Sequence, residues 1–343
     1  MVNKEELFSR WRATLSRRYE AGFGAEFTEQ AHQNLTHVFH DFMASGCADP
    51  IFLNGICSKD VSASTQRLGE MLLYERLCHS GLDPKPSPRG KGPDFCVKVE
   101  GRRIWLELIT PSTGDDSRIN ELFKGYDPLN PCPVDATDLR ERTLLRISHG
   151  IAEKLTKYEG YLEEGVVGPE DVLVIVVNDA AMCPDAFFYG VQFNADKGVG
   201  GPSLAEHAVY GIGQTTWELV GGQRRNARKN TSRELVENRP EPKRDGTARD
   251  PVPVSLFMKP VTEKAAIIAE RATIISAVLQ VTLREDYGVM MMFREKAENE
   301  NRILEGRLNP GVLAINPRSR NTLSAPAQGK LMRIVEAPDL SGI

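Results

Sequence analysis

The sequence predicts an α/β protein in which a mixed sheet is flanked by helices. Two strand-like apolar runs, 94–99 and 102–110, are separated by only two residues, which is typical of a hairpin. A long amphipathic helical pattern follows over 138–162, and a continuous apolar run at 172–177 indicates a fully buried strand. The order strand, strand, helix, strand therefore places an α/β core in residues 61–180.

Additional helices are predicted ahead of this core, in residues 1–60. Apolar residues recur at helical spacing near the start of the chain, and a second helix is expected over 27–43. Residues 46–55 contain glycines and an Asp-Pro pair and are predicted to form a loop. Within the core region, a helix is predicted over 66–79, after a run of Ser and Thr that can cap it.

The remaining residues, 181–343, are predicted to form an α+β region. Strands are expected at 254–258, 274–282 and 312–315, and a helix is expected at 262–272. We therefore expect three parts in the chain: a helical N-terminal region, the α/β core and this C-terminal region.

Composition excludes several classes of protein. The chain has 343 residues, of which 41% are hydrophobic, so it can bury a sizeable core and is not disordered throughout. It has no run of 18 apolar residues that could span a membrane, and its first residues do not resemble a signal peptide. Six well-separated cysteines without a C-x-x-C pair argue against a disulfide scaffold, so we expect reduced thiols in a cytoplasmic protein.

The side chains of the predicted hairpin sort cleanly by face. If Glu100 and Gly101 form the loop, Val99 pairs with Arg102 and every other cross-strand pair follows. A slip of one residue would place charges in the core, which supports this register. The apolar face then carries Phe95, Val97, Val99, Ile104, Leu106 and Leu108.

This register places Asp94 directly opposite Glu107 on the other face. Two carboxylates so placed repel each other, and a divalent cation such as Mg²⁺ would explain their pairing. Two alternatives remain open. Glu107 could be exposed or paired with a nearby arginine, and a longer loop would misalign the two residues.

The stretch resembles the PD-(D/E)xK nuclease superfamily. Pro93-Asp94 and Glu107 match the acidic positions on two successive strands, and Gly69-Glu70 on the preceding helix matches the family's helical glutamate. The resemblance covers about 62–180 and implies a restriction endonuclease-like core. It also implies that Asp94, Glu107 and Glu70 ligate Mg²⁺ or Mn²⁺. For Glu70, a surface position on an amphipathic helix is the alternative.

The sequence departs from the family at the strand lysine, where it has Ile109. Several family members supply this amine from a helix. Lys154 lies at the edge of the apolar stripe of the 138–162 helix, so its ammonium could emerge at the site, and it is our candidate for the catalytic lysine. The alternative is a surface lysine. Lys157 lies further round the helix and is interpreted as a contact to solvent or phosphate.

A basic segment, predicted to be a loop, covers residues 223–250. It contains nine Lys/Arg against five Asp/Glu, a local balance of +4 in a chain whose formal charge is −4. Basic stretches bind phosphates through counterion release. A solvated loop is the other interpretation. The residues expected to steer nucleic acid are Arg224, Arg225, Arg228 and Lys229.

These features lead to three functional hypotheses. The first is a metal-dependent nuclease that hydrolyses phosphodiester bonds in nucleic acid, with DNA favoured, in restriction, repair or defence. The second is a catalytically inactive nuclease-fold protein that binds nucleic acid or protein, because the loss of the strand lysine also suits a degenerate site. The third is a structural or partner-binding protein. No membrane partner is expected, and a homodimer is compatible with the resemblance.

Overall fold

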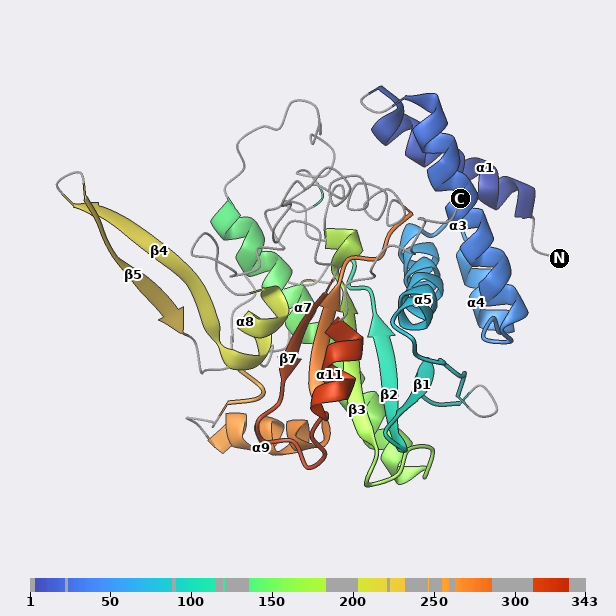
Figure 1. The fold of residues 1–343 in the computed structure, drawn as a ribbon. Helices are drawn as coiled ribbons and strands as arrows, with labels where there is room; N and C mark the ends of the chain where they lie inside the picture. The colour runs from blue at the N-terminus through green and yellow to red at the C-terminus, as the bar shows by residue number, and fades with distance from the viewer. Residues whose placement is uncertain are drawn as a thin grey trace.

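A five-stranded mixed sheet forms the centre of the molecule (Figure 1). The strands lie in the order β1 (Phe95–Val99), β2 (Arg102–Ile109), β3 (Val172–Asn178), β6 (Ala277–Val281) and β7 (Gly311–Ile315). The three central strands are parallel, and the two edge strands are antiparallel to their neighbours. The computed structural model of the chain describes residues 4–21, 24–87, 91–114, 120, 136–182, 203–220, 223–231, 246, 255–258, 263–285 and 311–332.

The sheet draws its strands from two of the three predicted parts of the chain. β6 and β7 come from residues 181–343, and β6 pairs directly with β3. The boundary predicted at residue 180 therefore does not separate the sheet from the C-terminal region. The sequence order of the first three strands is as predicted, and strands were also expected where β6 and β7 lie.

The predicted hairpin register is confirmed. Val99 pairs with Arg102 and Phe95 with Leu106, so the loop is formed by Glu100 and Gly101. Both loop residues have positive φ, 50° and 79°, as a two-residue turn of type I′ requires. This turn fixes which hairpin residues face each side of the sheet.

Helices cover both faces of the sheet. On one face, α3 (Ala25–Ala44), α5 (Val61–His79) and α11 (Ala325–Met332) contribute to a core with the hairpin's apolar residues. On the other face, α7 (Ala136–Glu163) and α8 (Leu204–Tyr210) pack against alternate residues of the same strands. Because both faces are covered, all seven residues of β3 are buried, which explains its continuous apolar sequence.

The N-terminal region is helical, as predicted, with one correction. It contains α1 (Lys4–Leu15), a π-helical turn (Ser16–Glu20) and α3, which the apolar spacing predicts. The predicted loop over 46–55 instead contains α4 (Pro50–Ile56). Asp49 caps this helix by accepting a hydrogen bond from the Phe52 amide at 2.6 Å, and Pro50 occupies its first turn.

The C-terminal region needs two corrections. Residues 223–231, predicted as part of the basic loop, form β5 (Gln223–Thr231), which pairs with β4 (Ile212–Val220) as a separate two-stranded sheet. Residues 255–258 form a turn, whereas a strand was expected at 254–258. The helix predicted at 262–272 is confirmed as α9 (Glu263–Arg271), which is followed by a 3-10 turn. Within the part of the chain that is described, no helix has the length and apolarity to span a membrane.

Candidate active site

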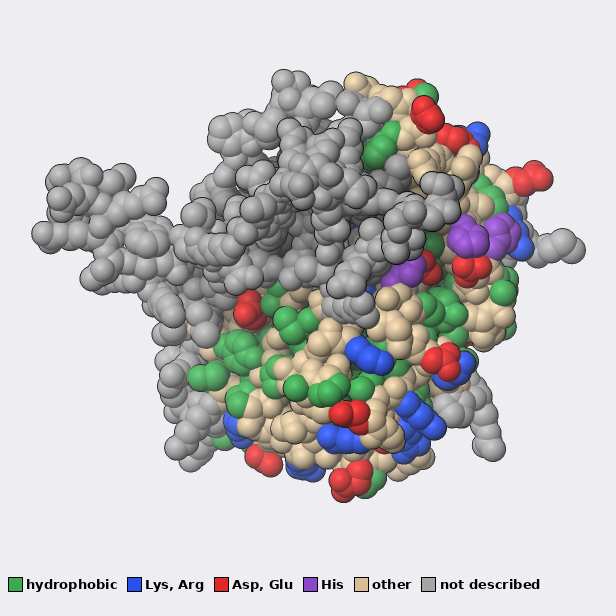
Figure 2. Space-filling model, in the orientation of Figure 1, with side chains coloured by type: hydrophobic (Ala, Val, Ile, Leu, Met, Phe, Trp, Pro, Cys, Tyr) green, Lys and Arg blue, Asp and Glu red, His purple; other side chains and the backbone are tan. Residues whose placement is uncertain are grey.

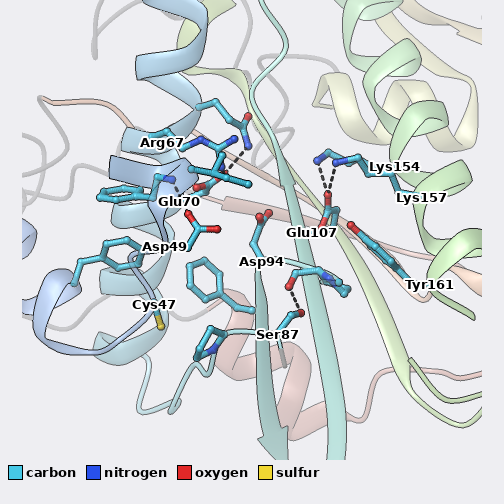
Figure 3. A pocket seen from close by; sticks show the side chains of 18 of the residues that line it. Cys47, Asp49, Arg67, Glu70, Ser87, Asp94, Glu107, Lys154, Lys157 and Tyr161 are labelled. Carbon is cyan, nitrogen blue, oxygen red and sulfur yellow. Dashed lines mark hydrogen bonds and ion pairs between the residues drawn. The ribbon is translucent and has the colours of Figure 1, made fainter. Parts of the chain in front are cut away.

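A cavity of about 360 Å³ lies where α4, α5 and α7 meet the β1–β2 hairpin (Figure 3). The four residues predicted from sequence to form a catalytic site, Glu70, Asp94, Glu107 and Lys154, all line it. Figure 3 shows Asp94 between Glu70 and Glu107. The structure therefore brings together residues from two helices, from β2 and from the position just before β1, which are up to 84 positions apart in the sequence (154 − 70).

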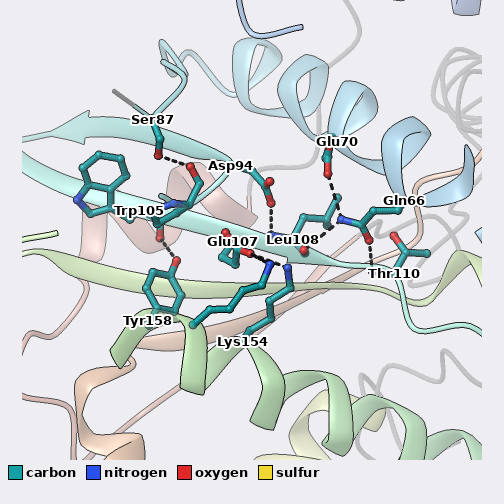
Figure 4. Close-up of polar contacts among 12 residues, drawn as sticks. Gln66, Glu70, Ser87, Asp94, Trp105, Glu107, Leu108, Thr110, Lys154 and Tyr158 are labelled. Carbon is teal, nitrogen blue, oxygen red and sulfur yellow. Dashed lines mark hydrogen bonds and ion pairs between the residues drawn. The ribbon is translucent and has the colours of Figure 1, made fainter. Parts of the chain in front are cut away.

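The hairpin positions Asp94 beside Glu107. Asp94 immediately precedes β1, and its Oδ2 accepts a hydrogen bond from the Leu108 amide at 2.7 Å (Figure 4). The preceding residue, Pro93, is held by its carbonyl, which accepts a hydrogen bond from the Ser87 hydroxyl. Asp94 is thus held directly by the Leu108 amide and indirectly by the Ser87 hydroxyl, which holds the residue before it. The other carboxylate oxygen of Asp94, Oδ1, takes no part in the contact with Leu108.

The two oxygens of the Glu107 carboxylate have different surroundings. Oε1 accepts hydrogen bonds from Lys154 Nζ at 2.6 Å and from Lys157 Nζ at 3.2 Å. Oε2 is buried and has no hydrogen-bond partner among the described residues. Only 2% of the Glu107 surface is exposed, so this unpartnered oxygen carries a real desolvation cost. A cation bound at Oε2 would offset that cost.

Packing of α7 against the sheet positions both lysines. Tyr158 on the same helix is fully buried, and its hydroxyl lies 3.0 Å from the Trp105 carbonyl and 2.9 Å from the Val174 carbonyl. This contact joins α7 to β2 and β3 next to the site. Lys154 is buried, whereas Lys157 is half exposed at the cavity wall. The interpretation of Lys157 as a contact to solvent or phosphate alone therefore needs correction, because it also pairs with Glu107.

Glu70 is held on the opposite wall by its own helix. Its Oε1 accepts hydrogen bonds from Arg67 at 2.5 Å and from Gln66 at 3.1 Å. The Gln66 amide also bridges α5 to the end of β2, since it donates to the Leu108 carbonyl and accepts from the Thr110 amide. Sequence reasoning missed both residues. Their positions three and four residues before Glu70 were the available signal, because such side chains are neighbours on a helix.

Burial raises the pKa values of two carboxyl groups in the cavity, Asp94 and Glu70. Burial raises the pKa of Asp94 well above its usual value, and the charges of Glu107 and Glu70 raise it further. Burial also raises the pKa of Glu70, although the Arg67 guanidinium opposes this shift. Tyr161, at the edge of the cavity, has its pKa raised to about 12 by burial and by the Glu107 charge. The site thus holds closely spaced carboxyls that a cation would stabilise in the charged form.

These residues fit a metal ion held by few protein ligands. Among the described residues, no group of three or more His, Cys, Asp or Glu side chains is close enough to hold a metal without other ligands. Mg²⁺ does not need such a group, because one or two carboxylates, water and substrate phosphates complete its shell. The unpartnered Oε2 of Glu107 and the neighbouring Asp94 carboxylate form a donor pair of this kind.

Ile109, which follows Glu107 by two residues on β2, has a packing role. Ile109 lies against Gly150 of α7, where an added Cβ would be 3.0 Å from Ile109 Cδ1. The close helix–sheet contact favours a branched apolar side chain there.

Comparisons of the chain with protein-family models, curated proteins and solved structures found no match.

The residues predicted to steer nucleic acid lie outside this cavity, on β5. Their side chains are not among those described, and the rest of the predicted basic segment, 232–250, lies outside the described residues apart from Gly246.

Proposed function

We propose that the protein is a metal-dependent nuclease that hydrolyses phosphodiester bonds in DNA. The observation that carries this proposal is the Glu107 carboxylate in the cavity that Asp94 also lines. One of its oxygens is bound by Lys154, and the other is buried and has no hydrogen-bond partner among the residues that the structure describes. Asp94 and Glu107 would hold Mg²⁺ or Mn²⁺, and Glu70 would serve as a third or second-metal ligand. The bound cation would polarise the scissile phosphate and lower the pKa of its water.

The remaining residues of the cavity have separable roles in this proposal. Lys154 holds Glu107 in place and supplies a fixed positive charge where negative charge develops on the phosphate. Lys157 is half exposed, so its ammonium can exchange Glu107 for an incoming phosphate oxygen. Arg67 balances the charge of Glu70, so a cation at Glu70 requires the guanidinium to move aside.

The test uses the wild-type chain, Asp94→Asn and Lys154→Met with plasmid and single-stranded DNA in Mg²⁺, Mn²⁺ or EDTA. Asp94→Asn retains an oxygen for the Leu108 amide but loses the charge that would bind the cation. We expect metal-dependent cutting by wild type, none by Asp94→Asn, and a rate lowered roughly 10²- to 10³-fold by Lys154→Met. The exposed Asp83→Asn is the matched control and should cut normally.

Two outcomes would overturn the nuclease proposal. Equal cutting by wild type and Asp94→Asn would show that these residues do not carry the activity. Cutting that persists in EDTA would remove the need for a metal. A thermal melt of each variant with and without Mn²⁺ separates loss of metal binding from loss of folding, because bound ligand raises the melting temperature.

One observation favours a second candidate, a nuclease-fold module that binds nucleic acid without cutting it. Lys154 and Lys157 together already neutralise Glu107, as expected of a site that no longer needs a cation. This candidate predicts DNA binding without turnover, and it predicts that Mg²⁺ and Mn²⁺ leave the melting temperature of wild type unchanged.

A further inference from the structure

The β4–β5 hairpin is a ribbon that projects from the body of the molecule beside α8 (Figure 1). Each strand has nine residues, which corresponds to about 30 Å of extended chain. The ribbon pairs with no strand of the central sheet. It therefore offers a long, narrow element to a partner outside the body.

The ribbon concentrates positive charge. β5 contains four basic residues and no acidic residue, and β4 contains the single acid Glu218. The described surface of the body in Figure 2 instead shows acidic and basic side chains close together. The basic residues of β5 are Arg224, Arg225, Arg228 and Lys229.

The register distributes these four cations over both faces of the ribbon. Arg224 pairs with Leu219 and Lys229 with Thr215. These two β4 positions are four residues apart, so they share one face. Arg225 and Arg228 pair with Glu218 and Thr216, which share the opposite face. The register shift between Thr216 and Glu218 adds one residue to β5, so that Arg224 shares its face with Lys229 and Arg225 shares its face with Arg228.

We propose that the ribbon binds duplex DNA by entering its major groove. A ribbon lying flat on a charged surface needs cations on one face, whereas a groove has phosphates along both walls. The major groove of B-DNA, about 12 Å wide, admits a two-stranded ribbon, but the deep, narrow major groove of an RNA duplex does not. This inference rests on the proposed nuclease function and names its substrate class, double-stranded DNA.

The test measures binding in EDTA, so that no cutting is needed. A short fluorescein-labelled DNA duplex, the RNA duplex of the same sequence and the single DNA strand are titrated between 50 and 200 mM salt. Two double variants remove one face each: Arg224→Gln with Lys229→Gln, and Arg225→Gln with Arg228→Gln. The control, Lys98→Gln with Arg102→Gln, removes two exposed charges from the β1–β2 hairpin.

We expect both ribbon variants to weaken binding of the DNA duplex by about tenfold or more and to reduce the salt slope by about two, since each phosphate contact contributes about 0.9. The control should bind as wild type does. Circular dichroism spectra identical to that of wild type would show that the variants are folded.

Several results would overturn the inference. These are no duplex binding by wild type, wild-type affinity in both ribbon variants, a loss confined to one face, or an equal dependence of RNA duplex binding on the ribbon. The nuclease proposal fails separately. Ribbon-dependent binding without any cutting would remove the nuclease alone, and metal-dependent cutting with ribbon-independent binding would remove the ribbon alone.

Discussion

Asp179 is a fully buried carboxyl that directly follows β3 and does not line the cavity of the candidate active site. Its Oδ1 accepts a hydrogen bond from the Thr282 hydroxyl, and its Oδ2 accepts one from the Gln280 amide, both at 2.6 Å. Burial raises its pKa from 3.8 to about 6, although these hydrogen bonds and the charge of Arg284 lower it. The effect of burial on the pKa of Asp179 is therefore larger than the opposing effect of its hydrogen bonds and of Arg284.

This raised pKa predicts a pH-dependent stability. Between about pH 4 and pH 6 the folded chain keeps a proton on Asp179 that the unfolded chain releases. The stabilisation that comes from binding this proton is therefore fully present below about pH 4 and is lost as the pH rises through 6. In total, the free energy of unfolding falls by about 3 kcal/mol. Asp179→Asn has no such titration. We expect its free energy of unfolding, relative to wild type, to increase by about 2–3 kcal/mol from pH 4 to pH 7 in urea melts.

The exposed Asp83→Asn serves as the control for the loss of a carboxylate and should follow the wild-type curve. Parallel curves for Asp179→Asn and wild type across this range would contradict the prediction.

The sequence identifies those side chains of the site whose positions depend on local periodicity. The pairing of Asp94 with Glu107 needs only the hairpin register, and Lys154 needs only the helical stripe of α7. Gln66 and Lys157 were not recognised as partners of the site, because their contacts depend on how closely a helix crosses the sheet. That crossing is a tertiary property that no single segment encodes.

The contact between α5 and the sheet depends on Gly69. A Cβ there would lie 2.7 Å from the Asn178 side-chain nitrogen and 3.2 Å from Leu108 Cδ2. The absence of a side chain allows the helix to approach β2 and β3, and Glu70 follows directly on the same helix. Glu70 therefore reaches the cavity because its neighbour on the helix is a glycine.

We predict that Gly69→Ala destabilises the protein by about 1–3 kcal/mol, because the added methyl forces α5 away from the sheet. Gly160→Ala on α7 is the matched control, since no atom of another described segment lies within 4 Å of its added Cβ. It should stabilise the protein by about 0.5–1 kcal/mol, the usual preference for alanine in a helix. Thermal and urea melts measure both. Stabilisation by Gly69→Ala would show that the close approach is unimportant.

Elements with a clear apolar pattern are predictable from the sequence, whereas the polar and basic β5 and the short α4 are not. Clear apolar patterns mark β1, β2, β3 and α7, because each of these elements buries at least one face. β5 lacks such a pattern, since most of its residues are polar or basic, so a loop was the natural expectation. α4 has only seven residues, and its Asp-Pro start is also a turn signal.

The whole molecule depends on strands that are distant in the sequence. β3 lies at the centre of the sheet, and its second neighbour, β6, begins 99 residues after β3 ends (277 − 178). Removal of β6 and β7 would expose one edge of β3 and uncover its apolar side chains. The α/β core predicted for residues 61–180 is therefore incomplete by itself.

We predict that a chain ending at residue 182 does not fold. It retains β1, β2 and β3 but lacks the strands that close the other half of the sheet. Far-ultraviolet circular dichroism and a urea melt should show no cooperative transition, whereas the full chain should show one under the same conditions. A cooperative transition in the shortened chain would mean that the three strands and their helices form an independent unit.

The strand order also has a consequence for synthesis on the ribosome. At about 5–20 residues per second, the 98 residues between β3 and β6 (179–276) require roughly 5–20 s to be translated. During that interval the nascent chain carries an apolar strand with one edge unpaired, which is a template for association with other chains. We therefore expect newly made protein to depend on a chaperone that shields β3 until β6 has emerged.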